Sequence, residues 1–171
     1  MRDVTTTTVK VNNGQWTPAR FKSFIVGQLR SATQRWGPKQ KCIQRAKVSH
    51  GLYKCEGCGT IGPPTLPPEV GKKRRIKNIV ADHINTIVPP EIGFTTYDDW
   101  ITRAFCELDG FQALCHKCHT IKSNEEKAIA KSAMAKLKQT DPRYANVNPD
   151  DEMAQRKYYK YGILKIPRPE K

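Results

Sequence analysis

Two identical Cys-x-x-Cys pairs are the feature that most constrains how this chain can fold. Cys55 and Cys58 form the first pair, Cys115 and Cys118 form the second, and 56 residues separate the two. Each pair places two thiolates within reach of one ion, and Zn²⁺ takes four sulfur ligands in a tetrahedron at about 2.3 Å. The spacing therefore predicts a structural tetracysteine zinc site that joins distant parts of the chain. Four thiolates leave no open position for a substrate, so this ion would stabilise the fold and not catalyse.

The other cysteines and the apolar pattern indicate the cellular compartment. No apolar run approaches about 18 residues, and the N-terminal MRDVTTTTVK lacks the apolar segment of a signal peptide. We therefore expect a cytoplasmic protein with no membrane partner. In a reducing compartment, six cysteines favour metal ligation, although separate buried or redox-active thiols are the alternative. Cys42 and Cys106 fit no pair and are expected to be buried apolar residues.

Length and composition predict one domain with a small core. A chain of 171 residues suits one compact domain, since domains typically take about 100–200 residues. Apolar residues make up 37% of the chain, and 12 prolines and 11 glycines indicate much irregular backbone. We expect long ordered loops around a core that a zinc ion partly replaces.

The net charge of +14 is concentrated on the flanks of the chain. Residues 1–54 carry 11 basic and 1 acidic side chains, and residues 120–171 carry 12 and 7. Residues 55–119, by contrast, carry 7 basic and 8 acidic side chains. This distribution predicts basic arms that hold a polyanion around a segment that holds a cation. A merely solvated, soluble surface is the alternative.

The N-terminal region is expected to be helical. Thr17 is a plausible N-cap and Pro18 suits the first helical position, where its missing N–H costs nothing. Apolar residues then recur at helical spacing as far as Trp36. We expect Gly37-Pro38 to end this helix and a second, shorter helix to cover about 39–48.

The central region is expected to combine loops with one strand. Residues 60–71 contain four prolines, which exclude a helix and a central strand. The β-branched residues of IKNIVADHI (76–84) predict a strand that ends near Asp82-His83. Further expected elements are a helix over 97–107, a turn and short strand over 108–114, and a helix from about Cys118 to Gln139.

A second group of candidate site residues overlaps the cysteine pairs. Asp82-His83 ends the predicted strand, and His119 follows Cys118 directly. Folding the second cysteine pair onto the strand would bring the three side chains together. A carboxylate and an imidazole suit a divalent cation, and an unligated imidazole beside them can act as a general base near neutral pH. Taken singly, each histidine is more typical of an ordinary surface or core residue.

These motifs resemble a known nuclease family. VADHI, GFQALCHKCHTIKS and CEGC resemble the zinc-stapled form of the HNH endonucleases, and WTPARFKSFIVGQLR resembles the start of small HNH proteins of tailed bacteriophages. The resemblance covers roughly residues 16–127. It implies an α+β fold in which a ββα-metal (His-Me finger) nuclease core carries a tetracysteine zinc site and added N-terminal helices.

The resemblance also implies residue roles. His83 matches the general base that activates water, and Asp82 and His119 match the two protein ligands of the catalytic metal. The four paired cysteines match the zinc ligands. Gly110 stands where the family has an Asn that orients the base, so a backbone carbonyl or Asp109 would have to serve here. Because adjacent strand residues point to opposite faces, the strand is expected to end or bulge at Asp82-His83.

The implied organisation has four parts. They are a flexible arm (1–15), a basic helical region (16–50), the HNH nuclease core with its zinc knuckles (51–140) and a basic, tyrosine-containing tail (141–171). Tyr158, Tyr159 and Tyr161 in the tail could stack on bases, although packing on the domain or disorder is favoured.

The expected activity is hydrolysis of DNA phosphodiester bonds with Mg²⁺ or Mn²⁺, and the resemblance implies that the products have 5′-phosphate and 3′-hydroxyl ends. Double-stranded DNA is the expected partner, bound mainly through its phosphates. The candidate contacts are Arg20, Lys22, Arg30, Arg35, Lys72, Lys73, Arg74, Arg75, Arg103 and Lys122. Solvated surface charge is the alternative for each of them.

Partners and rival functions stay open at this stage. One active site per chain makes nicking the default, so a monomer is sufficient and double-strand cutting requires a homodimer or two events. Resemblance to phage proteins suggests a role in DNA processing or packaging, beside a terminase or another packaging protein, and a phage-encoded protein would act in the cytoplasm of the host cell. The rival function is a non-catalytic zinc module that binds nucleic acid or docks on a larger phage or host machine.

Overall fold

The computed structural model describes residues 11–155. Within this range the chain is mixed α/β, with small antiparallel sheets between longer helices. The elements are, in order, α1 (Pro18–Thr33), α2 (Gly37–Arg45), β1 (Lys47–Ser49), β2 (Leu52–Lys54), β3 (Ile61–Gly62), β4 (Thr65–Leu66), β5 (Ile76–Lys77), β6 (Ile79–His83), α3 (Tyr97–Ala104), the 3-10 turn η1 (Leu108–Gly110), β7 (Phe111–Cys115), α4 (His116–Thr140) and the 3-10 turn η2 (Pro142–Tyr144). Residues 1–10 of the expected arm, and Tyr158, Tyr159 and Tyr161, lie outside the described residues.

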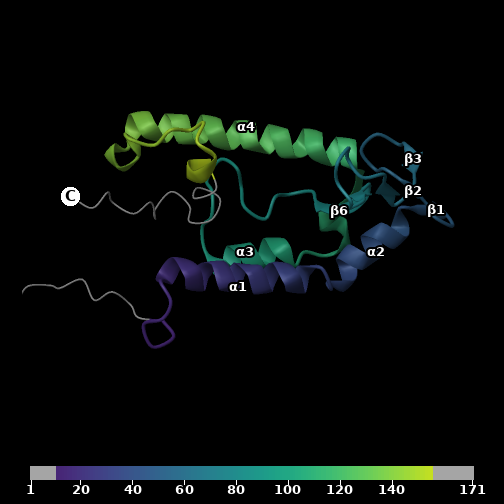
Figure 1. Ribbon diagram of the computed structural model, residues 1–171, viewed down its shortest axis with the longest axis horizontal. Helices are drawn as coiled ribbons and strands as arrows, with labels where there is room; N and C mark the ends of the chain where they lie inside the picture. Colours follow the sequence, from purple (N-terminus) through teal and green to yellow (C-terminus); the bar gives the residue numbers. More distant parts are fainter. Residues whose placement is uncertain (1–10, 156–171) are drawn as a thin grey trace, which may run out of the picture.

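The long helices lie on opposite sides of the molecule. Figure 1 shows α4 along one side and α1 along the other, with α3 against α1 and the short strands gathered with α2 at one end. Strands β1, β2 and β3 form one sheet, β4 pairs with β5, and β6 pairs with β7. Among residues 11–155, no helix has both the length and the apolar character needed to cross a membrane.

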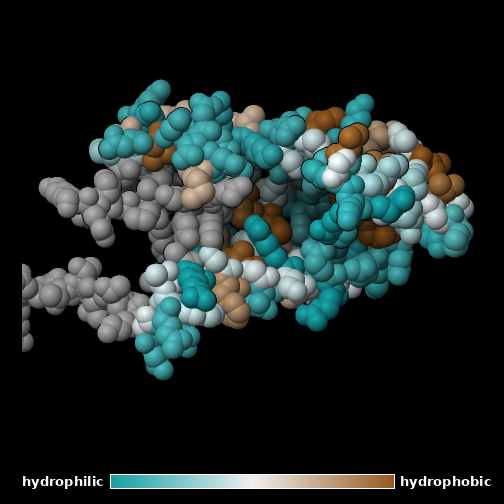
Figure 2. Space-filling model, in the orientation of Figure 1, coloured by the Kyte–Doolittle hydropathy of each residue, from teal (hydrophilic) through white to brown (hydrophobic). Residues whose placement is uncertain are grey.

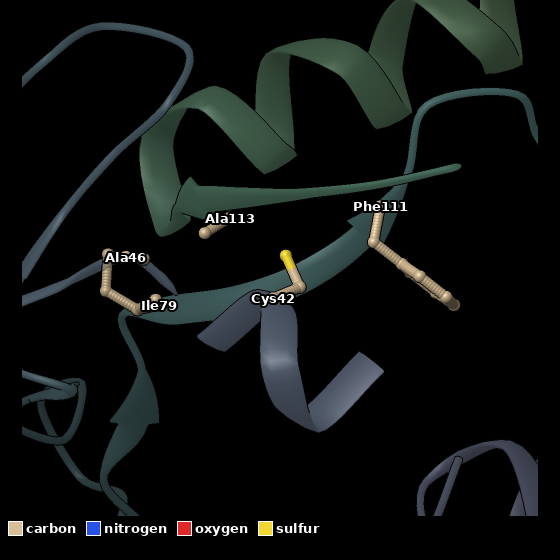
Figure 3. Packing of buried hydrophobic residues seen from close by; sticks show 5 residues of the cluster. All are labelled: Cys42, Ala46, Ile79, Phe111 and Ala113. Atoms are coloured by element: carbon tan, nitrogen blue, oxygen red, sulfur yellow. The ribbon is translucent and has the colours of Figure 1, made fainter. Parts of the chain in front are cut away.

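The antiparallel pair β6–β7 is the centre of the fold, and α4 follows β7 directly. Its register runs without a bulge from Ile79 opposite Cys115 to His83 opposite Phe111. Helix α2 covers one face of the pair through a cluster of buried side chains (Figure 3). The cluster contains Cys42, Ala46, Ile79, Phe111 and Ala113. Cys42 is fully buried, as expected, and Cys106 packs against the same cluster while partly exposed.

The first helix begins where the sequence predicts and ends earlier. Thr17 Oγ1 accepts a hydrogen bond from the backbone N–H of Arg20 at 3.2 Å, which is the predicted N-cap. The expectation that Gly37-Pro38 ends α1 is wrong, because both residues lie in the first turn of α2. Proline is tolerated there since the first N–H groups of a helix have no intrahelical partner. Trp36 lies between the helices and donates from Nε1 to the Cys106 carbonyl at 2.7 Å.

The second helix and the predicted strand are also shorter than expected. Helix α2 ends at Arg45 instead of Val48, and the chain continues into β1. The strand expected over 76–84 is divided into β5 and β6 at Asn78. Asn78 donates from its backbone N–H to the Pro64 carbonyl and from Nδ2 to the Pro63 carbonyl, at 2.8 and 2.7 Å. These bonds hold the proline-rich loop against the break in the strand. Strand β6 ends at His83, as predicted.

Helices α3 and α4 have different ends from those expected. Helix α3 ends at Ala104 instead of Glu107, because Phe105 leaves the helical conformation with φ −108° and ψ 39°. The last carbonyls of a helix have no intrahelical partner, so the Ala104 oxygen is free to accept another donor. Helix α4 begins at His116, two residues before the expected start at Cys118, and ends at Thr140.

Candidate metal-binding and catalytic site

The four paired cysteines come together as predicted. Cys55 and Cys58 lie in the turn after β2, Cys115 ends β7, and Cys118 lies in the first turn of α4. Their sulfur atoms all lie within 4.8 Å of one another, and the Sγ atoms of Cys58 and Cys115 are 3.8 Å apart. A tetrahedron of thiolates suits a metal ion such as zinc, so the cluster can hold one.

Local contacts form the first cysteine turn. Gly59 adopts φ +74° and donates its N–H to the Cys55 carbonyl at 2.9 Å. A Cβ atom at Gly57 would lie 3.0 Å from Leu114 Cδ2, so a larger residue would require the Leu114 side chain to shift by a few tenths of an ångström. Glu56 ties the turn to the core, because its carboxylate accepts from Arg45 at 2.8 Å and from the Ala113 N–H at 2.6 Å.

The thiols of the cluster differ in their acidity in the absence of a metal ion. A hydrogen bond with the Thr60 hydroxyl, at 3.3 Å, is the main cause that lowers the pKa of Cys58 to about 6. Hydrogen bonding with the Cys58 sulfur, which favours the neutral thiol, is the main cause that raises the pKa of Cys118 to about 12. A metal ion must therefore displace protons to bind all four sulfurs.

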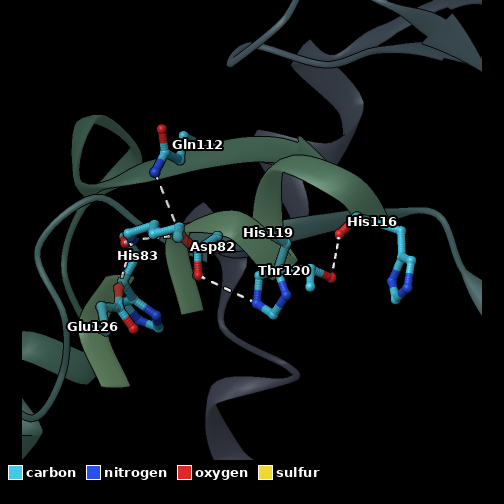
Figure 4. A network of polar contacts seen from close by, with 8 residues as sticks. Asp82, His83, Gln112, His116, His119, Thr120 and Glu126 are labelled. Carbon is cyan, nitrogen blue, oxygen red and sulfur yellow. Dashed lines mark hydrogen bonds and ion pairs between the residues drawn. The ribbon is translucent and has the colours of Figure 1, made fainter. Parts of the chain in front are cut away.

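The second predicted group also comes together. His119 Nε2, from the second turn of α4, lies 3.7 Å from Asp82 Oδ1 on β6. Gln112, opposite Asp82 on β7, donates to Asp82 Oδ2 at 3.4 Å (Figure 4). The Asp82 side chain is 17% exposed and that of His119 is 42% exposed, so both are reachable from solvent. An oxygen and a nitrogen donor at this separation form part of a candidate site for a divalent cation.

His83 lies at the end of the strand and is held by α3 and β7. Its Nε2 lies 3.1 Å from the Ala104 carbonyl, and its ring lies 4.6 Å, between centroids, from Phe111. A carbonyl oxygen can only accept, so this bond places the proton of neutral His83 on Nε2 and leaves the Nδ1 lone pair free. Burial is the main cause that lowers the pKa of His83, which keeps the imidazole neutral.

Gly110 has a steric explanation in this chain. A Cβ atom at this position would lie 2.6 Å from Cys106 Sγ and 2.9 Å from Cys106 Cβ. The Gly110 carbonyl accepts from the Ile84 N–H at 2.9 Å and so holds the chain just after His83. The contact with the His83 ring is made by the backbone carbonyl of Ala104.

Two side chains of α4 that complete this environment are Lys122 and Glu126. Lys122 Nζ donates to Asp82 Oδ2 at 2.5 Å and to the His83 carbonyl, and it lies 3.5 Å from Glu126 Oε1. Lys122 is a predicted DNA contact, whereas the structure shows its ammonium bound to Asp82. Glu126 was not predicted, although it lies two helical turns after His119, so the helical repeat was the available signal. Burial raises the pKa of Glu126, with the neighbouring Lys122 opposing the shift.

A groove connects this group to the N-terminal helices. It has a volume of about 590 Å³, and a recess lies between the α4 side and the α1 side of the molecule in Figure 2. Asp82, His83, His119 and Glu126 line it together with Arg30 and Lys39. Lys39 was not predicted as a site residue. It reaches the groove from the first turn of α2, and no local pattern could have revealed this.

The predicted DNA contacts occupy different environments. Arg20, Arg30, Arg35 and Lys72–Arg75 are exposed, and Arg103 is partly exposed. Lys72 pairs with Glu69 at 2.5 Å, and Arg75 donates to Thr65 Oγ1 at 2.9 Å. The expectation for Lys22 is wrong, because this residue is 8% exposed and its ammonium lies 3.6 Å from the centre of the Phe94 ring.

Comparison with protein-family models, curated proteins and solved structures finds no match for this chain. What this site does is therefore inferred from its residues and their geometry. The strongest features are the tetracysteine cluster and His119, which directly follows the last cysteine of the cluster and lies close to Asp82.

Proposed function

We propose that the protein is a metal-dependent DNA endonuclease of the HNH type. The observation that carries the proposal is the 3.7 Å approach of His119 to Asp82, with the His83 imidazole on the adjacent residue of the same strand. The succession of β6, β7 and α4 supports a ββα-metal core, since β6 and α4 supply all three side chains. The net charge of +14 supports a nucleic acid as the substrate.

Each side chain has a role in the proposed reaction. A divalent ion, Mg²⁺ or Mn²⁺, bound by Asp82 and His119 would stabilise negative charge on the phosphate and on the departing 3′-oxygen. His83 takes a proton from the attacking water through Nδ1, while the Ala104 carbonyl holds Nε2–H and orients the ring. The depressed pKa of His83 suits this role, because only the neutral imidazole can accept the proton.

The tetracysteine cluster has a structural role in this proposal. Zinc bound there would hold the start of α4 to the turn after β2 and to the end of β7. Because His119 directly follows the ligand Cys118, the ion would also fix the position of His119 relative to β6. Strand β7, which ends at Cys115, pairs with β6 along the whole length of both strands. This pairing keeps Asp82 and His83 in register. The ion would act on the site through the fold alone, since four thiolates fill its coordination.

Cleavage of supercoiled plasmid tests the proposal. We expect nicking with Mg²⁺ or Mn²⁺, its loss on chelation, and a fall of roughly 10²–10⁴-fold in rate for His83→Ala. DNA binding by this variant should be unchanged. His116→Ala is the matched control, since His116 is exposed on α4 and points away from Asp82 and His119 (Figure 4). Cutting by His83→Ala at the wild-type rate would refute the proposed role of this histidine.

A non-catalytic zinc module that binds nucleic acid is the second candidate. The specific observation in its favour is the ion pair of Lys122 with Asp82, because a cation of the chain already neutralises the proposed metal ligand. This candidate predicts DNA binding with no nicking under any divalent ion. It leaves unexplained why His83 is held with its Nδ1 free.

We propose a place in phage DNA processing or packaging, with double-stranded DNA as the substrate and a terminase or another packaging protein as the partner. A single site per chain supports nicking by a monomer, and double-strand cutting would require a homodimer or successive events. Gel filtration with light scattering, alone and with DNA, would distinguish these states.

A further inference from the structure

Lys39 brings a positive charge from outside the strand–strand–helix unit into the groove of the candidate site. It lies in the first turn of α2, and this helix packs on β6 and β7 through Cys42 and Ala46. The groove that Lys39 lines also contains Asp82, His83 and His119. The packing of α2 therefore fixes where the Lys39 charge lies relative to the site.

The environment of Lys39 is unusual for a lysine. The side chain is half-buried, and no ion pair within the described range 11–155 involves it. Burial is the main cause that lowers its pKa, and the more distant charge of Asp82 opposes the shift. Partial burial of a lysine side chain without an anionic partner is unfavourable, and a bound anion would relieve this. Arg30 lines the same groove and would add to the attraction.

We propose that Lys39 binds a non-bridging oxygen of the scissile phosphodiester in this groove. The inference rests on the proposed function, because the phosphate would lie between Lys39 and the group of Asp82, His83 and His119. The bond from the water oxygen to phosphorus forms, His83 takes the water proton, and the bond from phosphorus to the 3′-oxygen breaks. The leaving oxygen takes a proton from solvent. Lys39 keeps its proton throughout and offsets the charge that builds up on the phosphate oxygens.

A phosphate is the anion that this groove fits best. Candidate metal ligands and a candidate base line it, and both act on a phosphodiester in the proposed reaction. Lysine is a common point-charge partner of phosphate oxygens. A purely structural Lys39 would instead be expected to have a carboxylate partner, and none of the ion pairs in the described part of the chain supplies one.

Binding of thymidine 3′,5′-bisphosphate, measured by calorimetry without metal, tests this inference separately from catalysis. We expect Lys39→Met to weaken binding roughly 10- to 100-fold, the scale of one charged hydrogen bond, and Lys39→Arg to restore most of it. Lys41→Met is the matched control, since Lys41 is exposed on the same helix and does not line the groove. Equal binding by Lys39→Met and the wild type would overturn the inference. So would an equal loss in Lys41→Met, which would reflect net charge alone.

Plasmid cleavage then separates the inference from the proposed function. We expect Lys39→Met to lower kcat more than it raises KM, because its contact strengthens as charge builds up on the phosphate. If the bisphosphate binds through Lys39 and the wild type never nicks DNA, the groove is an anion site and the proposed function fails. Lys39→Gln provides a second variant if circular dichroism shows that Lys39→Met is unfolded, and retained binding by a folded Lys39→Gln would equally overturn the inference.

Discussion

Lys122 donates to Asp82 Oδ2 at 2.5 Å, while Asp82 Oδ1 lies 3.7 Å from His119 Nε2. One carboxylate thus faces a cation of the chain with one oxygen and a candidate metal ligand with the other. A divalent ion that binds at Asp82 has to share this carboxylate with the ammonium or displace it. Lys122 is therefore expected to control how tightly the site binds a metal ion.

Replacing Lys122 by Met should tighten Mn²⁺ binding. Removal of a like charge beside a partly exposed site is worth about 1 kcal/mol, which corresponds to about fivefold in affinity. Titration followed by electron paramagnetic resonance measures the change. Lys127→Met is the control, since Lys127 lies further along α4 and has no part in the Asp82 contacts. Weaker Mn²⁺ binding in the Lys122 variant would show that the ammonium orients Asp82 for the metal instead of competing with it.

The rate of DNA cleavage should depend on the protonation of His83. Burial lowers the pKa of this imidazole below its ordinary value of about 6.5, so the neutral form that accepts a proton persists into mildly acid solution. The rate should rise with pH through the lowered pKa and become level above it. A pH profile of kcat/KM at saturating Mg²⁺ measures the midpoint of this acid limb. A midpoint above about 6.5 would contradict the assignment of His83 as the base.

Loss of the tetracysteine metal should destabilise the whole fold. In small zinc domains the bound ion contributes on the order of 10 kcal/mol, so Cys118→Ser should lower the free energy of unfolding by several kcal/mol and lower the bound zinc. Urea denaturation and metal analysis of the purified protein test this. Cys106→Ala is the control, because Cys106 lies outside the cluster and this variant should keep its metal. Full zinc content in Cys118→Ser would refute a four-thiolate site.

Restoring the Asn of the HNH pattern should be harmful in this chain. Gly110 has no left-handed φ, so the expected cost of Gly110→Asn comes from overlap with Cys106 and is about 1–3 kcal/mol. Adding Cys106→Ala removes the closest contact, the one to Sγ. Denaturation of both single variants and the double variant measures the coupling. Additive losses would show that the two residues are not in steric conflict.

Local spacing was sufficient to predict several elements and groups. The Cys-x-x-Cys pairs predicted the cluster, Thr17-Pro18 predicted the start of α1, and the β-branched run before Asp82 predicted β6. The physical reason is that ligand reach, helix capping and strand preference depend on neighbours in the chain. Helix ends were predicted less well, since the ends of α1 and α3 depend on what Trp36 and Phe105 contact.

The sequence by itself determined which chemistry is present: two thiolate pairs, an Asp-His dipeptide and a histidine beside the last cysteine. Only the tertiary structure decided how these groups are used. It places the Ala104 carbonyl on His83, the Lys122 ammonium on Asp82 and the Lys39 charge in the groove. These contacts join residues from different elements, so they depend on how α2, α3 and α4 pack around β6 and β7. Packing of this kind is set by burial and shape across the whole domain, which spacing along the chain does not encode.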